Sequence, residues 1–457
     1  MMDIYAGIVR YAVHPLWVLK DGKWSLFRYL REFEEFQYRD PQTIKESQWK
    51  KLNRLMSHAY ENCPFYRSRF DAAGLKPSSI QDPSDFRRIP FLTKKDIQEN
   101  LPALVATNYN LNDLVPNKTG GSTGSPLHYY HDRERIISME ASAIRHDRWT
   151  GYKVGDKMAG IWGSRTDLSG VRGWKGRIQR LLFRSGAILD SSSITDERLA
   201  HFVEVLREFK PKSILAYANS VYVFAQYCKE HGVRDIHPAS IITSAEVLHD
   251  HERVLIEEVF RCKVFNRYGC REVSVIASEC SGHSGLHINA DTLYVEFVDD
   301  NGQAVSPGQQ GNIIITDLLN FGMPFLRYKI EDIGSPSETV CPCGRTLPLM
   351  QMVAGRTTDF IVTPDGKRVS GAALTIYLIS NVPGIRQAQI IQDVLDHVTF
   401  KIVPGPEFKD SGLALLKQKV PEFFGEGMRY DITYVDSIPK EPSGKYRFTI
   451  SKIGSRG

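Results

Sequence analysis

The regular alternation of amphipathic helical segments and short apolar runs from residue 197 onward most strongly limits the fold of this chain. Apolar residues recur at three- and four-residue intervals in ERLAHFVEVLREF, NSVYVFAQYCKEHG and HDHERVLIEEVF. The runs between and after them, SILAY, SIITS and CKVFNRYG, are typical of strands. A chain with this order forms helical layers on a sheet that is at least partly parallel, so we predict an α/β fold.

Other segments of the chain carry different periodicities. Residues 293–318 show β-type alternation on both sides of Asn301-Gly302, a pair that is typical of a hairpin turn. Helical periodicity covers residues 25–75 and 133–149, and Thr93 is placed as the N-cap of a further helix. The large part of the chain therefore combines layered α/β structure with a β-rich region.

The character of the sequence changes near VAGRTTDF, at residues 353–360, and the following hundred residues alternate short helical and β-like segments. We therefore predict two domains. The first is a large N-terminal domain of residues 1–354, and the second is a small α+β domain of residues 355–457.

Residues 171–184, VRGWKGRIQRLLFR, are basic and place apolar residues near helical spacing. Two interpretations stay open for this segment. It is either an amphipathic helix packed on its domain with solvated arginines, or a helix that meets a membrane surface or another anionic partner.

Bulk composition excludes several classes of protein. Hydrophobic residues make up 42% and charged residues 24% of the 457 residues, which is ordinary for a globular protein. A net charge of +5 spread over this length does not indicate nucleic acid, and seven cysteines do not indicate a secreted disulfide framework. The first residues are too interrupted by polar groups for a signal peptide or a transmembrane segment, so we expect a cytoplasmic protein. The oligomeric state is left open.

The segment KTGGSTGSPL, residues 118–127, is a glycine- and hydroxyl-rich loop of the kind that surrounds a polyphosphate. Its glycines let backbone N–H groups approach anionic oxygens, and its hydroxyls add donors. It lacks the Gly-Lys-Ser/Thr ending of a Walker A loop. Alone, such a loop is more often a turn than a phosphate site.

With the segments that follow it, the chain resembles the adenylate-forming superfamily, and within it the branch of phenylacetate–CoA ligases, coenzyme F390 synthetases and CapK proteins. The resemblance runs from about residue 50 to 450 and keeps the family's motif order. It begins with the phosphate loop, where Gly120 replaces a usual serine and Leu127 a common lysine. The loop residues that the resemblance assigns to ATP are Thr119, Gly121, Ser122, Thr123 and Gly124.

Several downstream motifs extend the resemblance to the adenosine and to Mg²⁺. Ala245 and Glu246 resemble the short turn that lies against adenine. In the motif Asn266 to Glu272 the resemblance puts Tyr268 on the purine ring and Glu272 on Mg²⁺, a cation that prefers carboxylate and phosphate oxygens. Asp332 would accept hydrogen bonds from the two ribose hydroxyls. The nucleotide-binding set is completed by Arg267, Gly269 and Arg356.

The end of the chain resembles the family's hinge and catalytic loop. Residues 355–359 match the hinge motif, with Thr358 in place of its first acid, so the pivot lies there or at Asp359. Residues 439–445, PKEPSGK, match the loop that presents Lys445. A mobile ammonium stabilises the charge that develops when a carboxylate attacks the α-phosphate, so Lys445 and Glu272 are the predicted catalytic residues.

Cysteines and histidines gather in two further segments, Cys280-x2-His283-x3-His287 and Cys341-Pro-Cys343. Three cysteines and one histidine form a closed structural zinc set. The resemblance selects Cys280, His287, Cys341 and Cys343, because the branch shares Cys…Gly-Leu-His and Cys-Pro-Cys-Gly, and it leaves His283 spare. Reduced cysteines without a metal are the alternative.

The resemblance implies an ATP- and Mg²⁺-dependent ligase that makes an acyl-adenylate from a small carboxylic acid, of an aryl or related kind. The acceptor is most simply the thiol of coenzyme A, and an amine or sugar hydroxyl in capsular or exopolysaccharide biosynthesis is the alternative. A weakened scaffold member and a sugar nucleotidyltransferase are two further alternatives. The acyl pocket is predicted to include His131, Trp162, Arg165, Tyr217 and Arg271.

Overall fold

The computed structural model describes most of the chain. The described residues are 3–119, 127–163, 187–191, 194–354, 357–358, 360–371, 374–379, 382–405, 408–439 and 447–453. The predicted basic helix at 171–184 and Arg165 lie outside them.

Helices dominate the first hundred residues, as their apolar periodicity predicts. Asp40 caps the longest of them through the backbone N–H of Thr43, and Thr93 caps another through Asp96, which confirms the Thr93 prediction. This part contains α1 (Ile4–Ile8), η1 (Val9–Val13), α2 (His14–Lys20), α3 (Ser25–Phe36), α4 (Pro41–Asn62), α5 (Pro64–Ala72), η2 (Pro77–Ser79), α6 (Pro83–Phe86), α7 (Lys94–Leu104) and η3 (Leu111–Asp113).

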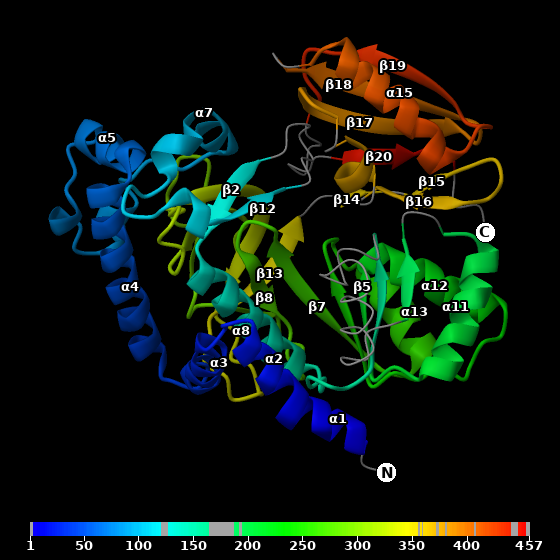
Figure 1. Cartoon of the computed structure of the whole chain (residues 1–457), viewed down its shortest axis with the longest axis horizontal. Coiled ribbons are helices and arrows are strands. Elements are labelled where there is room, and N and C mark those ends of the chain that lie inside the picture. Colours follow the sequence, from blue (N-terminus) through cyan, green and yellow to red (C-terminus); the bar gives the residue numbers. More distant parts are fainter. Residues whose placement is uncertain are drawn as a thin grey trace.

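A mixed sheet of eleven strands forms the centre of the described residues before 355, and Figure 1 shows its strands between the N-terminal helices and α11–α13. One half is parallel, in the order β4-β3-β5-β6-β7, as the alternating pattern predicts. Its elements are α8 (Arg133–Trp149), β3 (Met158–Trp162), β4 (Ile188–Asp190), α11 (Asp196–Phe209), β5 (Ser213–Tyr217), α12 (Ala218–Glu230), β6 (Ser240–Ser244), α13 (Asp250–Phe260) and β7 (Lys263–Cys270).

The other half of the sheet is antiparallel, in the order β7-β8-β9-β13-β12-β11-β10. The predicted Asn301-Gly302 turn is present, because Gly302 has φ +79° and its N–H donates to the carbonyl of Asp299. It lies inside the longer connection between two paired strands rather than directly between them. The strands are β8 (Ser274–Ser278), β9 (Leu286–Ile288), β10 (Leu293–Val298), β11 (Gly311–Asp317), β12 (Tyr328–Ser337) and β13 (Leu349–Ala354).

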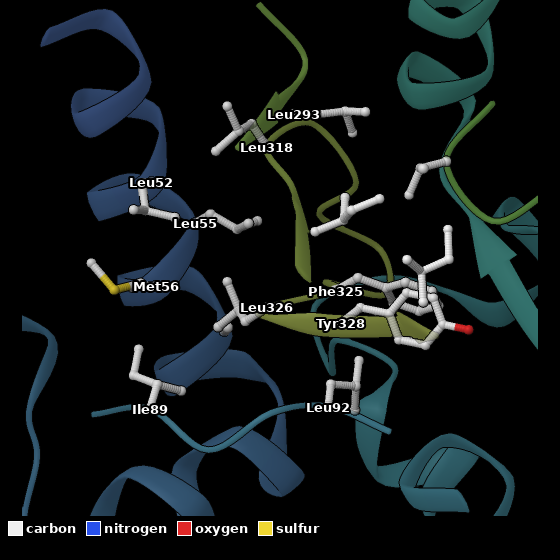
Figure 2. Packing of buried hydrophobic residues seen from close by; sticks show 14 of the residues in the cluster. Leu52, Leu55, Met56, Ile89, Leu92, Leu293, Leu318, Phe325, Leu326 and Tyr328 are labelled. Atoms are coloured by element: carbon white, nitrogen blue, oxygen red, sulfur yellow. The ribbon is translucent and has the colours of Figure 1, made fainter. Parts of the chain in front are cut away.

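Each half of the sheet packs around an apolar core of its own. The parallel half is packed by side chains of β3, β5 and β6 against α11, α12 and α13. The antiparallel half is packed against the long helix α4. Figure 2 shows Leu52, Leu55 and Met56 of that helix near Leu326, with Tyr328 at the other end of the same cluster. The ring of Tyr328 is therefore fixed by packing on several sides.

The C-terminal residues have a third core of their own, built from residues between Ile361 and Phe448. Phe360 also packs against the core of the parallel half, so the two parts of the chain are in contact. The elements are β14 (Thr357–Thr358), β15 (Phe360–Val362), β16 (Arg368–Ser370), η4 (Leu374–Leu378), β17 (Ile385–Val394), β18 (His397–Pro404), α15 (Asp410–Phe424), β19 (Arg429–Tyr434) and β20 (Arg447–Ser451). The predicted α/β class with a small α+β appendix is confirmed.

Candidate active site and candidate metal centre

Strand β7 is where the sheet changes from parallel to antiparallel. Its first residues, up to Asn266, pair in parallel with β6, and its last residues, from Arg267, pair antiparallel with β8. The predicted motif from Asn266 to Glu272 therefore lies at a switch in strand direction. Ligands of open α/β sheets bind outside the carboxyl ends of the parallel strands, and the motif follows the part of β7 that pairs in parallel.

Four predicted site residues lie at the carboxyl ends of parallel strands. Trp162 ends β3 and Tyr217 ends β5, and their ring centroids are 4.3 Å apart. Ala245 follows β6 in a left-handed conformation, with φ +68°. The carboxylate of Glu246, the next residue, accepts the backbone N–H of Asn219 at 3.0 Å. The fold thus gathers two predicted pocket residues and two predicted adenine-turn residues at one edge of the sheet.

Glu272 follows β7 and is held from two sides. The hydroxyl of Tyr328 donates to its carboxylate at 2.9 Å. The Nε2 atom of His131, at the end of β2 (His128–His131), lies 2.7 Å from its backbone carbonyl. A carbonyl only accepts, so Nε2 carries the proton and Nδ1 accepts from Asn117 at 3.2 Å.

The Glu272 site fits Mg²⁺ in its chemistry. Its carboxylate is 5% exposed and is oriented by Tyr328, so one hard oxygen ligand is fixed beside the strand switch. Mg²⁺ takes one or two carboxylates and completes its shell with water and phosphate oxygens. Arg271, beside it, is exposed, while His131 is buried.

Tyr268 and Asp332, predicted at the purine and the ribose, are in direct contact. The phenol of Tyr268 donates to the carboxylate of Asp332 at 2.8 Å. A bulge in β12 places Asp332, because the register against β11 shifts here and Glu331 adopts φ +71°. Both residues are half-buried.

Arg267 and Gly269, on either side of Tyr268 in β7, are held by other contacts. The Arg267 guanidinium pairs with Asp147 of α8 at 2.6 Å and is 9% exposed. A Cβ atom on Gly269 would lie 2.5 Å from the carbonyl oxygen of Ser274, so only glycine fits at this strand crossing. The structure shows both residues supporting the motif, and their predicted contact with the nucleotide stays a prediction.

The predicted phosphate loop falls between β1 (Val115–Lys118) and β2, which pair antiparallel. Thr119 closes its base, because its N–H donates to the Leu127 carbonyl at 3.0 Å and its hydroxyl accepts the Leu127 N–H at 3.1 Å. The remaining loop predictions, Gly121, Ser122, Thr123 and Gly124, lie outside the described residues.

Arg356 and Lys445 also lie outside the described residues, but their neighbours are paired. Thr357 of β14 pairs in parallel with Arg447 of β20. The predicted hinge and the predicted catalytic loop are thus anchored to adjacent strands of one five-stranded sheet. Residues some 90 positions apart in sequence meet at the same place in the fold.

The predicted zinc ligands form one compact cluster. The ligand atoms of Cys280, His287, Cys341 and Cys343 all lie within 4.8 Å of one another, and His283 is not in the group. Cys280 Sγ lies 3.4 Å from both His287 Nε2 and Cys341 Sγ, and Cys343 Sγ lies 3.4 Å from the same His287 Nε2. Neighbouring ligands of a tetrahedral zinc lie roughly 3.4–3.8 Å apart, so the donor set fits this metal.

The surroundings of the cluster also suit a metal. His287 Nδ1 lies 3.3 Å from the carbonyl of Leu347, which turns Nε2 toward the thiols. Burial lowers the pKa of His287 to about 4, so its imidazole is neutral at pH 7. A Cβ atom on Gly282 would lie 2.7 Å from Cys341 Sγ, so glycine is required for this close approach.

Tyr328 is the site residue that sequence reasoning missed. It lies within the motif that predicted Asp332, four residues before it on the same strand. The bulge at Glu331 interrupts the alternation between the two residues, so their spacing gave no signal, and only the shared motif pointed to Tyr328. Its partner Glu272 could not be inferred, because the pairing joins elements that are 56 residues apart.

Comparisons with known proteins support the predicted family branch. The family described as the CapK C-terminal domain matches residues 361–452. A phenylacetate–coenzyme A ligase of Thermus thermophilus is 25% identical over 83% of this chain and 86% of its own length. Protein CapK of Staphylococcus aureus is 23% identical over 93% of this chain and 94% of its own.

Solved structures give the same fold. A 2-hydroxyisobutyryl–CoA ligase in complex with 2-HIB-AMP and CoA has a TM-score of 0.63 at 19% identity, covering 92% of this chain and 91% of its own. The fold, with its strand switch at β7 and its separate C-terminal core, is that of the adenylate-forming enzymes. Similarity to the phenylacetate–CoA ligases and to CapK over most of the chain, together with the C-terminal family match, supports the predicted branch of that superfamily.

Proposed function

We propose that the protein is an ATP-dependent ligase that activates a carboxylic acid as its acyl-adenylate and transfers the acyl group to coenzyme A. One observation carries the proposal. The Glu272 carboxylate and the Tyr268–Asp332 pair lie together beside the strand switch, at the edge where the sheet ends in Trp162 and Tyr217. Phenylacetate–CoA ligases with a quarter of their residues identical support the same chemistry.

In this proposal each group has a distinct role. Glu272 holds Mg²⁺, which neutralises the phosphate charge when bound. Asp332 accepts hydrogen bonds from the ribose hydroxyls, and Tyr268 lies against the purine. The acid binds near Trp162 and Tyr217, whose rings offer an apolar wall. The ammonium of Lys445 stabilises the charge that builds on the α-phosphate during carboxylate attack.

We propose further that residues 355–457 move as a domain during the cycle. Their separate core and the pairing of β14 with β20 support a unit that carries Lys445 next to its own pivot. Asp359→Pro fixes one backbone angle at this pivot. We expect the variant to release pyrophosphate and to lose thioester formation, and equal loss of both steps would count against the pivot.

The test of the main proposal is pyrophosphate release from ATP with a panel of aryl, fatty, hydroxy and amino acids. One class of acid should stimulate release, and Lys445→Ala should abolish it. Lys440→Ala, five residues earlier in the same segment, is the matched control and should stay active. If no acid stimulates pyrophosphate release or exchange, the protein is better described as a scaffold than as an enzyme. A product in which AMP is attached to a sugar would indicate a nucleotidyltransferase.

A second acceptor class has specific support. The C-terminal residues match the CapK family, and the CapK protein of Staphylococcus aureus spans nearly the whole chain. An amine or sugar hydroxyl of a capsular or exopolysaccharide intermediate is therefore the alternative acceptor. Hydroxylamine traps the adenylate in either case, and only the CoA ligase converts it to a thioester when coenzyme A is added.

The four-ligand cluster is proposed as a zinc site of structural type. Four protein ligands leave no position for a substrate, so the metal would hold the loop after β8 against the loop before β13. We also propose a cytoplasmic location, in keeping with the free cysteines of the described residues.

A further inference from the structure

Exposed apolar side chains are concentrated at the start of the chain. Among the described residues, sixteen large apolar side chains are exposed, and eight of them lie between Ile4 and Phe27. The other eight are spread from Tyr38 to Tyr434. Single exposed apolar residues are ordinary, but such a concentration marks a contact surface.

Five of these eight side chains follow one face of a continuous helical run, Ile4–Lys20, made of α1, η1 and α2. An α-helix turns 100° per residue, so Leu16 would lie about 120° from Ile4 in a uniform helix. The π-helical turn η1 rotates less per residue and returns Leu16 to the face of Ile4 and Ile8. The exposed face consists of Ile4, Ile8, Tyr11, Leu16 and Leu19.

The opposite face of the run is fixed to the body of the protein. Ala6, Val9 and Val18 are buried. Arg10 donates to the Val154 carbonyl at 3.0 Å and pairs with Asp156 at 2.9 Å. The exposed stripe is therefore held outward by packing on the other side, and in Figure 1 α1 lies at the lower edge of the molecule.

Two more exposed aromatic side chains follow the run. Trp24 is 72% exposed, and Phe27 is exposed on α3. Tyr11 is 78% exposed on the run itself, so large rings as well as aliphatic side chains face solvent in this part of the chain.

The chemistry of the stripe favours a lipid bilayer over a second copy of the chain as the surface that covers it. Tyr5, Tyr11 and Trp24 have apolar rings with one polar atom, the type enriched where a bilayer meets water. The run itself, residues 4–20, contains Arg10 and Lys20 and no acidic residue, whereas α3 carries charges of both signs. Lys23 and Arg28 pair with glutamates of α8, and Lys20 and Arg31 are exposed. A second copy of the chain would bring the same positive segment, without complementary charge.

We propose that this first helical run lies flat on an anionic lipid bilayer, with its apolar stripe in the interfacial region. No helix among the described residues has the length and apolarity to cross a bilayer. A helix with one apolar face and flanking basic residues binds in the plane of the membrane surface instead. The inference is independent of the proposed ligase activity.

The test is cosedimentation of the full chain with vesicles of phosphatidylcholine and phosphatidylglycerol, compared with phosphatidylcholine alone. The chain should bind the anionic vesicles, and added salt should weaken binding. The double variant Ile8→Ser, Leu16→Ser should lower the partition coefficient at least tenfold. Val254→Ser with Val340→Ser is the matched control, because these residues are 65% and 88% exposed elsewhere, and it should bind as the unaltered chain does.

Three results would overturn the proposal. The first is absence of binding to anionic vesicles, and the second is equal binding by the stripe variant and the control. The third is a dimer by light scattering that the stripe variant alone converts to monomer, since a second copy then covers the stripe. Lys20→Gln with Arg31→Gln adds a readout for charge, and it should reduce the preference for anionic over neutral vesicles.

Discussion

The hydroxyl of Tyr328 donates to the carboxylate of Glu272 across 2.9 Å, joining the start of β12 to the end of β7. Tyr328 is fully buried, and its ring packs in the core between α4 and the antiparallel strands. The donor therefore cannot move without disturbing that core. The contact orients the one acid that the proposed mechanism assigns to Mg²⁺, so Tyr328 acts as a positioning residue.

Tyr328→Phe should weaken the binding of Mg²⁺ by Glu272. The variant keeps the ring and removes only the donor, and a hydrogen bond to a charged group is worth about 1.5–3 kcal/mol. We expect adenylation to fall about 10–100-fold and the Mg²⁺ concentration for half-maximal rate to rise. Tyr294→Phe on β10 is the control, since it also truncates a partly buried phenol of the sheet. An unchanged Mg²⁺ titration would show that Tyr328 only packs.

Asp332→Asn should impair recognition of the ribose. Asp332 is held by Tyr268 at 2.8 Å, and its carboxylate would accept the ribose hydroxyls. Loss of these charged acceptors should raise the KM for ATP about tenfold or more. Tyr268→Phe keeps the ring beside the purine and should raise KM only a few-fold.

The nucleotide itself supplies the discriminating control for Asp332. The unaltered protein should prefer ATP to 2′-deoxy-ATP, and Asp332→Asn should lose most of that preference. If the variant discriminates as well as the unaltered protein, Asp332 does not contact the ribose.

Zinc removal should destabilise the large domain without acting on the chemistry directly. The protein should contain one zinc per chain by elemental analysis, and chelation or Cys341→Ser should lower Tm by several degrees, on the scale of about 2–4 °C per kcal/mol. Cys262→Ser, outside the cluster, should keep its zinc. If the protein contains no metal and chelation does not change its Tm, the four residues are three reduced cysteines and a neutral histidine without zinc.

Local periodicity was enough to predict most elements of the fold. The helix expected at 133–149 is α8, and the strands expected after residue 212 are β5, β6 and β7. The pairing of strands was harder to predict, because the residues of one strand do not show whether the neighbour on each side is parallel or antiparallel. The change of direction within β7 was therefore not foreseen.

The site shows the same division between local and long-range information. The cysteine and histidine set that the resemblance selected forms one spatial cluster, although Cys280 and Cys341 are 61 residues apart and spacing alone could not join the two halves. The Tyr328–Glu272 contact was missed, because it depends on how β12 packs beside β7. Arg267 illustrates a different limit, as its motif position suggests the nucleotide while its guanidinium pairs with Asp147 of α8.

His131 should make thermal stability depend on pH in a defined direction. Burial and the nearby Arg135 lower its pKa below the ordinary 6.5. Above pH 6.5 the imidazole is neutral in both the folded and the unfolded chain. As pH falls below 6.5 the unfolded chain takes up the proton first, so stability is lost between 6.5 and the lower folded-state pKa.

His131→Gln isolates this contribution, because glutamine can donate toward the Glu272 carbonyl and accept from Asn117 without titrating. The variant should have a lower Tm than the unaltered protein at pH 7.5, and the difference should narrow toward pH 5. His14 and His146, whose pKa values burial also lowers, are present in both chains and cancel in the comparison. A Tm difference that stays constant from pH 7.5 to 5 would mean that the pKa of His131 is the same in the folded and the unfolded chain.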